Sequence, residues 1–185
     1  MTSPATSYDQ RLNAVGGFVL LLLAGYGFWF VAIVPHTVFD PPWIFLDYAN
    51  LIFHEAGHFI FAFFGDFLRV LGGSLMQLIV PGVALGSFVF QKQSLSSGFA
   101  LFWLGESLCN LSFCISDART QALPLLGGDT SGHDWTWLLT RLNILDSDTL
   151  LGGFVHSLAF LIMLTGLVWM ARSIYGMWMG KEDIA

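Results

Sequence analysis

The sequence has few charged residues, fewer basic than acidic ones, and only two cysteines. Only 11% of its 185 residues are charged, with 7 Lys and Arg against 13 Asp and Glu. Ordinary globular domains have roughly a quarter charged residues. Without a cationic surface to neutralise phosphates, we expect no binding of nucleic acid. The two cysteines, Cys109 and Cys114, lie in one apolar run and exclude a disulfide framework.

Apolar residues are abundant and occur in long runs. Hydrophobic residues make up 55% of the chain and aromatic residues 16%. A helix needs about 20 apolar residues to cross a bilayer. Five runs of that kind occur, at about residues 15–34, 44–64, 70–90, 98–116 and 150–171. The sequence therefore predicts the all-α class, as a polytopic transmembrane helix bundle in one integral membrane domain over residues 1–185.

The longest connection, residues 117–149, contains an amphipathic stretch that begins at Asp134. Its apolar residues recur at helical spacing: Trp135, Leu138, Leu139, Leu142 and Leu145. Arg141 lies off this apolar stripe. Such a pattern is typical of a helix that lies in the membrane interface and does not cross it.

The basic residues give only a weak indication of orientation. With a cytoplasmic N-terminus they divide four inside to three outside, and residues 35–49 then face outward with two acids and no base. Positive residues favour the cytoplasmic side. We therefore expect a multi-pass protein of the bacterial inner-membrane type, surrounded by the lipid bilayer, with its N-terminus in the cytoplasm.

Three ionisable residues interrupt the second apolar run, in the sequence HEAGH. Each costs about 2.5–3.5 kcal/mol at the centre of a span, so a functional reason is expected. On a helix, His54 and His58 lie one turn apart and can bind one ion, while Glu55 points about 100° away and can reach a water on that ion. Imidazole nitrogens are good ligands for Zn²⁺. Glu55 could first accept the proton of the metal-bound water, as general base, and then donate it, as general acid.

A catalytic zinc usually has three protein ligands, so a third is needed. Glu106, Asn110 and Asp117 share one stripe of the fourth predicted span. The residues alone leave three candidates open: Asp117, Glu106, or the pair His133 and Asp134 folded back towards the metal. Asp134 also stands where a helix N-cap is expected.

The segments FHEAGHFIFAFFG and GGSLMQLIVPG resemble the site-two protease family of intramembrane zinc metalloproteases. In that family the third zinc ligand is an aspartate on a later transmembrane helix. The nearest match here is NLSFCISDAR, which contains Asn110 and Asp117. The resemblance implies Zn²⁺ held by His54, His58 and Asp117, with Glu55 as the catalytic residue.

The resemblance also implies a reaction and a substrate. The expected activity is hydrolysis of a peptide bond in or near a transmembrane segment of another membrane protein. A second hypothesis is a non-catalytic accessory or scaffold subunit of a larger membrane complex. It is favoured by the absence of a recognisable regulatory domain and by Ala118, which stands where the family has glycine.

Two residues of the third predicted span complete the candidate site. Pro81 removes one backbone hydrogen bond, which is tolerated at membrane depth beside protein or a water-filled cavity. Gln77 lies one turn earlier. We hypothesise that its amide faces the substrate backbone or an oxyanion.

Overall fold

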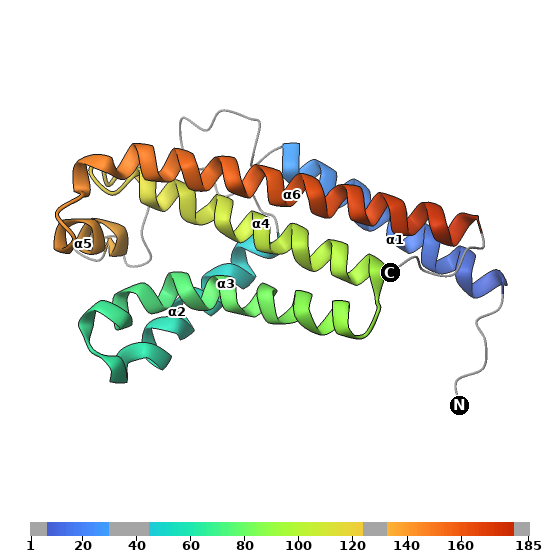
Figure 1. Ribbon diagram of the computed structural model, residues 1–185, viewed down its shortest axis with the longest axis horizontal. Helices are drawn as coiled ribbons and strands as arrows, with labels where there is room; N and C mark the ends of the chain where they lie inside the picture. The colour runs from blue at the N-terminus through green and yellow to red at the C-terminus, as the bar shows by residue number, and fades with distance from the viewer. Residues whose placement is uncertain (1–6, 30–44, 124–132, 180–185) are drawn as a thin grey trace.

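The computed structural model describes residues 7–29, 45–123 and 133–179, and every regular element within them is helical. The elements are α1 (Ser7–Phe28), α2 (Phe45–Phe61), η2 (Ala62–Phe64), α3 (Asp66–Phe90), α4 (Ser94–Ser116), α5 (Asp134–Arg141), η4 (Leu145–Ser147) and α6 (Asp148–Trp178). The long helices α4 and α6 lie side by side, with α1 along α6 and the α2–α3 pair on the other side of α4 (Figure 1). The all-α prediction is confirmed.

Among the described residues, three helical segments are long and apolar enough to cross a membrane: α3, α4 and residues 145–178. The apolar part of α1 that the structure describes, Asn13–Phe28, is shorter, and α2 has 17 residues. These three segments correspond to the third, fourth and fifth predicted spans, and each helix begins earlier than its predicted span. The five-span count is therefore supported in part.

Helices α4 and α6 approach each other through small residues. Gly98 and Gly105 are seven residues apart on α4. Gly166 of α6 faces Gly98, and Ala159 and Met163 of α6 face Gly105. A Cβ on Gly166 would lie 2.6 Å from the backbone N of Phe102 and 2.8 Å from the backbone O of Gly98. Without side chains at these positions the two backbones pack in direct contact, as is common for helices in membranes.

Replacing Gly166 with alanine is expected to separate α4 from α6. The new methyl group collides with backbone atoms, which cannot rotate away, and overpacking of this kind costs about 1–3 kcal/mol. Thermal unfolding in detergent should show a lower midpoint for Gly166→Ala. Gly153→Ala is the matched control, because a Cβ at Gly153 of the same helix meets nothing within 4 Å. Equal midpoints for the two variants would contradict this packing.

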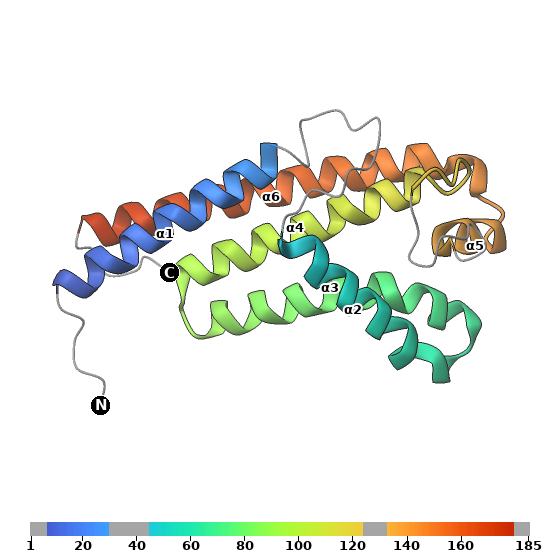
Figure 2. The same cartoon turned by 180° about the vertical axis from the view of Figure 1, so that it is seen from behind.

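Helices α2 and α3 also pack through glycine. A Cβ on Gly57 would collide with the backbone O of Gly72, so α2 and α3 touch where these glycines meet. Gly65 has φ of 91°, a left-handed value that favours glycine, and it ends η2 just before α3 begins. Figure 2 shows α2 lying across α3.

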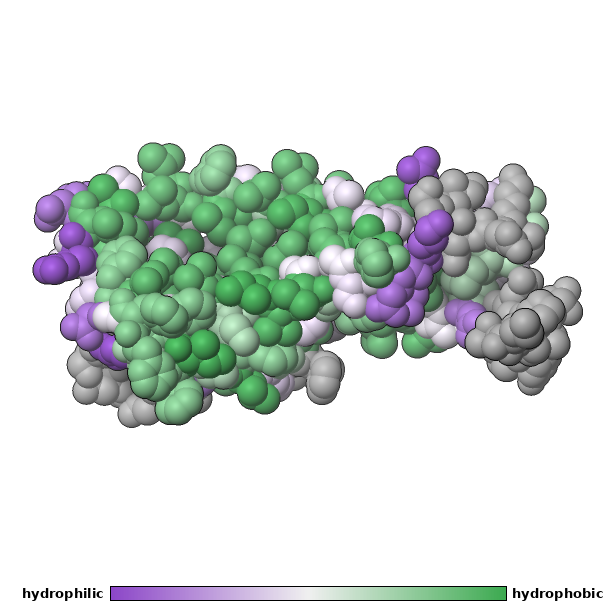
Figure 3. Space-filling view, turned by 60° about the horizontal axis from the view of Figure 1, so that its bottom comes forward, coloured by the Kyte–Doolittle hydropathy of each residue, from purple (hydrophilic) through white to green (hydrophobic). Residues whose placement is uncertain are grey.

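The outer surface is apolar over large areas. Exposed fractions reach 75% for Phe59, 85% for Phe63 and 90% for Phe90. Figure 3 shows apolar side chains over most of the face that carries α2 and α3, with hydrophilic ones gathered towards the two ends. A large contiguous apolar surface of this kind is typical of contact with a membrane or a partner protein.

At the α5 end of the bundle, polar and apolar contacts hold the chain segments together. The side chain of Arg119 donates from Nε to Oδ1 of buried Asp148, at 2.8 Å, which ties the end of α4 to the start of α6. Leu139 of α5 packs on Ile115 and Ala118. The predicted amphipathic helix exists but is shorter than expected, because α5 ends at Arg141 and the chain turns before η4.

Candidate metal centre

The two histidines of HEAGH point towards one carboxylate. Nε2 of His54 lies 2.9 Å from Oδ2 of Asp134, and Nε2 of His58 lies 3.0 Å from the same oxygen. The two imidazole rings are 4.8 Å apart between centroids and nearly perpendicular. One ligand atom from each of the three residues lies within 4.8 Å of the others, so these residues could hold a metal ion.

The other ring nitrogen of each histidine is already engaged. Nδ1 of His54 lies 3.2 Å from Oε1 of Gln77. The amide nitrogen of that glutamine donates to Ser107 O and Asn110 Oδ1, which leaves Oε1 as an acceptor. Nδ1 of His58 lies 2.9 Å from the backbone O of Arg69. Both rings therefore carry hydrogen on Nδ1 and present Nε2 to Asp134, the usual arrangement of metal-binding histidines.

A proton on Nε2 or a metal ion among the three side chains accounts for these close contacts. Two imidazole lone pairs and a carboxylate oxygen repel one another unless a proton or a metal ion lies among them. Zinc bonds of about 2.0–2.2 Å separate tetrahedral ligands by about 3.4 Å, so the three side chains fit that ion after small adjustments.

Asp134 is in the protonation state that a metal ligand requires. Burial acts to raise the pKa of Asp134, but the imidazoles of His54 and His58 beside its carboxylate outweigh burial and hold that pKa below its ordinary value. The carboxylate is therefore ionised at neutral pH, as metal binding needs.

Gly73 makes room for the ligand atoms. A Cβ at this position would lie 2.7 Å from Nε2 of His54 and 2.7 Å from Nε2 of His58. A side chain at this position would press on both imidazole rings at their Nε2 atoms. The sequence analysis did not identify Gly73. Its signal was the Gly72–Gly73 pair within an apolar run of bulky residues.

Glu55 lies between the two histidines on α2 and is exposed. Glu55 directly follows His54 in the chain and precedes His58 by three residues, so it lies within one helical turn of both ligands. An exposed carboxylate beside two imidazoles is accessible to water, as a proton acceptor must be.

The predicted third ligand, Asp117, lies elsewhere. Its carboxylate accepts hydrogen bonds from Thr120 Oγ1 at 2.5 Å and from the backbone N of Ala122 and Leu123, each at 2.9 Å. These bonds outweigh the effect of burial and lower the pKa of Asp117. The structure brings Asp134 to the histidines, which was one of the alternatives, and leaves Asp117 out of the group of three.

Glu106, the other alternative, also has a different environment. It is buried, and its Oε2 accepts from Nδ2 of Asn50 at 2.6 Å. Asn50 in turn accepts from Trp103 and Ser107, so a polar network joins α2 to α4. Gln77 joins α3 to this network through Ser107. Its amide supports His54 and the backbone of α4, in place of the predicted contact with substrate.

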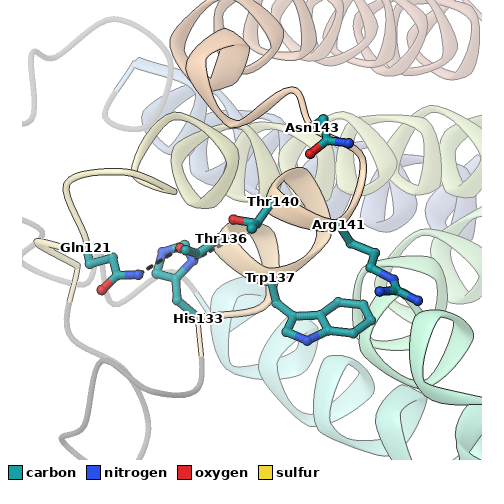
Figure 4. A pocket seen from close by; sticks show the side chains of 7 residues that line it. All are labelled: Gln121, His133, Thr136, Trp137, Thr140, Arg141 and Asn143. Atoms are coloured by element: carbon teal, nitrogen blue, oxygen red, sulfur yellow. Dashed lines mark hydrogen bonds between the residues drawn. The ribbon is translucent and has the colours of Figure 1, made fainter.

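An open cavity of about 730 Å³ lies along α5 (Figure 4). It is lined by Gln121, His133, Thr136, Trp137, Thr140, Arg141 and Asn143. In Figure 4 the side chains of Gln121 and His133 lie on one side of α5, and those of Trp137 and Arg141 on the other. None of the three candidate ligands His54, His58 and Asp134 is among the lining residues.

Comparison with known proteins gave no relative. No protein-family model, no curated protein and no solved structure matches this chain.

Proposed function

We propose that the protein is a membrane-embedded zinc metallopeptidase with His54, His58 and Asp134 as metal ligands and Glu55 as general base. The proposal depends on one observation above all: Nε2 of both histidines faces a single carboxylate oxygen, with each Nδ1 held by an acceptor. Asp134 replaces Asp117 as the proposed third ligand because the oxygens of Asp117 accept hydrogen bonds from its own turn.

The chemistry follows from the donor set. When bound, zinc lowers the pKa of a coordinated water towards 7 and polarises a carbonyl group. Three protein ligands leave one position for water or substrate. Glu55 accepts the proton of the attacking water and passes it to the leaving amine.

The substrate in this proposal is a transmembrane segment of another membrane protein, cleaved in or near the membrane. Such a segment must unwind locally, because a continuous helix engages its carbonyls in its own hydrogen bonds. We also propose that α1 and α2 cross the membrane, which gives the protein five spans. Exposed apolar residues support this topology on both helices, with Leu22 and Leu23 on α1 and Ile52 and Phe59 on α2. A cytoplasmic N-terminus and an inner membrane of bacterial type belong to the same proposal.

Metal analysis of the purified protein tests the centre directly. Protein from zinc-supplemented cells should carry about one zinc per chain, and His54→Ala and His58→Ala should carry less than about a tenth, since each removes a ligand. Acidification below about pH 6 should release the metal, because protons compete for the imidazoles.

His156→Ala is the matched control for this measurement. His156 lies in α6, where its Nδ1 is 3.2 Å from Oγ of Ser112, outside the candidate centre. This variant should keep its zinc. Zinc content that is negligible in the unmodified protein, or unchanged in both HEAGH variants, would overturn the proposed function.

A further inference from the structure

Asp117 holds a turn together at the end of α4. It follows the last residue of the helix, and three donors from the next six residues bind its carboxylate. Because these donors include the backbone N of Ala122 and Leu123, the carboxylate fixes the path of the main chain over 117–123. The residue is 8% exposed, so water competes little for these bonds.

The same carboxylate faces His133, which begins α5. Oδ2 of Asp117 lies 3.4 Å from Nε2 of His133, whose side chain is 3% exposed. Nδ1 of His133 accepts from the backbone N of Thr136, so this histidine is the N-cap of α5. With Nδ1 as acceptor, a neutral ring carries its hydrogen on Nε2 and donates it to Asp117. The expectation that Asp134 caps the helix is wrong, because His133 occupies that position and Asp134 is the first helical residue.

Further hydrogen bonds attach the first residues of α5 to the turn at residues 117–123. Oγ1 of Thr136 donates to the backbone O of Ala118 and accepts from the amide of Gln121. Helix α5 has only eight residues, and isolated helices of that length are not stable in water. The orientation of α5 and its position relative to α2 therefore depend on these contacts and on the burial of Leu138 and Leu139.

We propose that Asp117 and His133 are positioning residues for the metal centre, which orient the start of α5 so that Oδ2 of Asp134 meets both histidines. Asp134 is adjacent to His133 in the chain, so a small rotation at the N-cap moves its carboxylate away from the ion. The inference rests on the proposed metal site and assigns Asp117 a role other than ligand. It resembles the support that outer residues give to metal ligands in other proteins, where loss of a supporting contact lowers metal affinity about 10–100-fold.

The test uses the full-length protein in detergent, with zinc affinity measured by competition against a fluorescent chelator and visible spectra recorded after substitution with Co²⁺. Asp117→Ala and His133→Ala should bind zinc about 10–100-fold more weakly and shift the Co²⁺ spectrum towards that of Asp134→Ala. His133→Asn should keep near-normal affinity, because asparagine can cap the helix and donate to Asp117. A purely structural effect on folding would not change the ligand-field spectrum of the folded fraction.

Thr140→Ala, an exposed change on the same helix, is the control and should bind normally. The inference fails if Asp117→Ala and His133→Ala match this control while Asp134→Ala loses affinity, and in that case the metal site stands. It also fails if Asp117→Ala abolishes binding and Asp134→Ala does not, because Asp117 would then be the ligand. Should the alanine variants not fold, Asp117→Asn, which keeps the size of the side chain and removes its charge, gives the same comparison with Thr140→Ala. Failure of the metal site itself appears separately, as unchanged zinc binding in His54→Ala and His58→Ala.

Discussion

Replacing Glu55 with glutamine is expected to abolish peptide hydrolysis and to leave the zinc content unchanged. Glutamine has the size of glutamate but cannot accept a proton, and loss of a general base lowers rates by about 10²–10⁴-fold. The side chain is exposed, so the substitution should not disturb packing. New N-termini in membrane proteins, labelled at their amines and identified by mass spectrometry, should appear in cells with the active protein and not with Glu55→Gln.

Asp66→Asn provides the control for this experiment. Asp66 is the first residue of α3, and its side chain is 79% exposed beside Arg69. Removing its charge should leave hydrolysis intact. New N-termini of equal abundance with and without Glu55 would contradict its role as base. If neither protein produces any, and the chain co-purifies with a partner in fixed ratio, the accessory-subunit hypothesis replaces the enzyme.

The helices could be predicted because apolar runs of membrane length leave few other solutions for the backbone. Their first turns could not. Asp66–Arg69 and the serines that open α4 look like turn residues, yet a first helical turn accepts polar residues because its N–H groups need partners. The first two spans differ in another way, since the described apolar part of α1, Asn13–Phe28, and the 17-residue α2 are both shorter than the roughly 20 apolar residues that cross a bilayer.

Within the candidate centre, the sequence was informative only where the contacts are local. His54 and His58 belong to one helix, so their spacing alone predicts that they share a face. Asp134 is 80 residues from His54 in the chain, and no periodicity relates the two. Spacing therefore did not separate Asp117 from Asp134, and the resemblance favoured Asp117. What distinguishes them is the set of backbone donors around Asp117, which depends on a turn that the sequence pattern did not predict.

Gly73→Ala is expected to have the other large effect, loss of the metal centre without loss of the bundle. A single methyl group at this position would lie 2.7 Å from Nε2 of both histidines, well inside their contact distance. Helix α2 cannot retreat while Gly57 remains packed on Gly72, so the rings must rotate away from Asp134. We expect zinc affinity to fall about 100-fold, the upper part of the range for lost support of a ligand.

Gly82→Ala is the matched control. It reports how replacing glycine with alanine in α3 changes helix stability when no steric collision occurs. Gly82 lies on α3 as well, and a Cβ there meets nothing within 4 Å. Both variants should retain similar helix content by circular dichroism, and only Gly73→Ala should lose zinc in metal analysis. Because the methyl group adds no charge and removes no ligand, normal zinc binding by Gly73→Ala would mean that the ion does not lie among His54, His58 and Asp134.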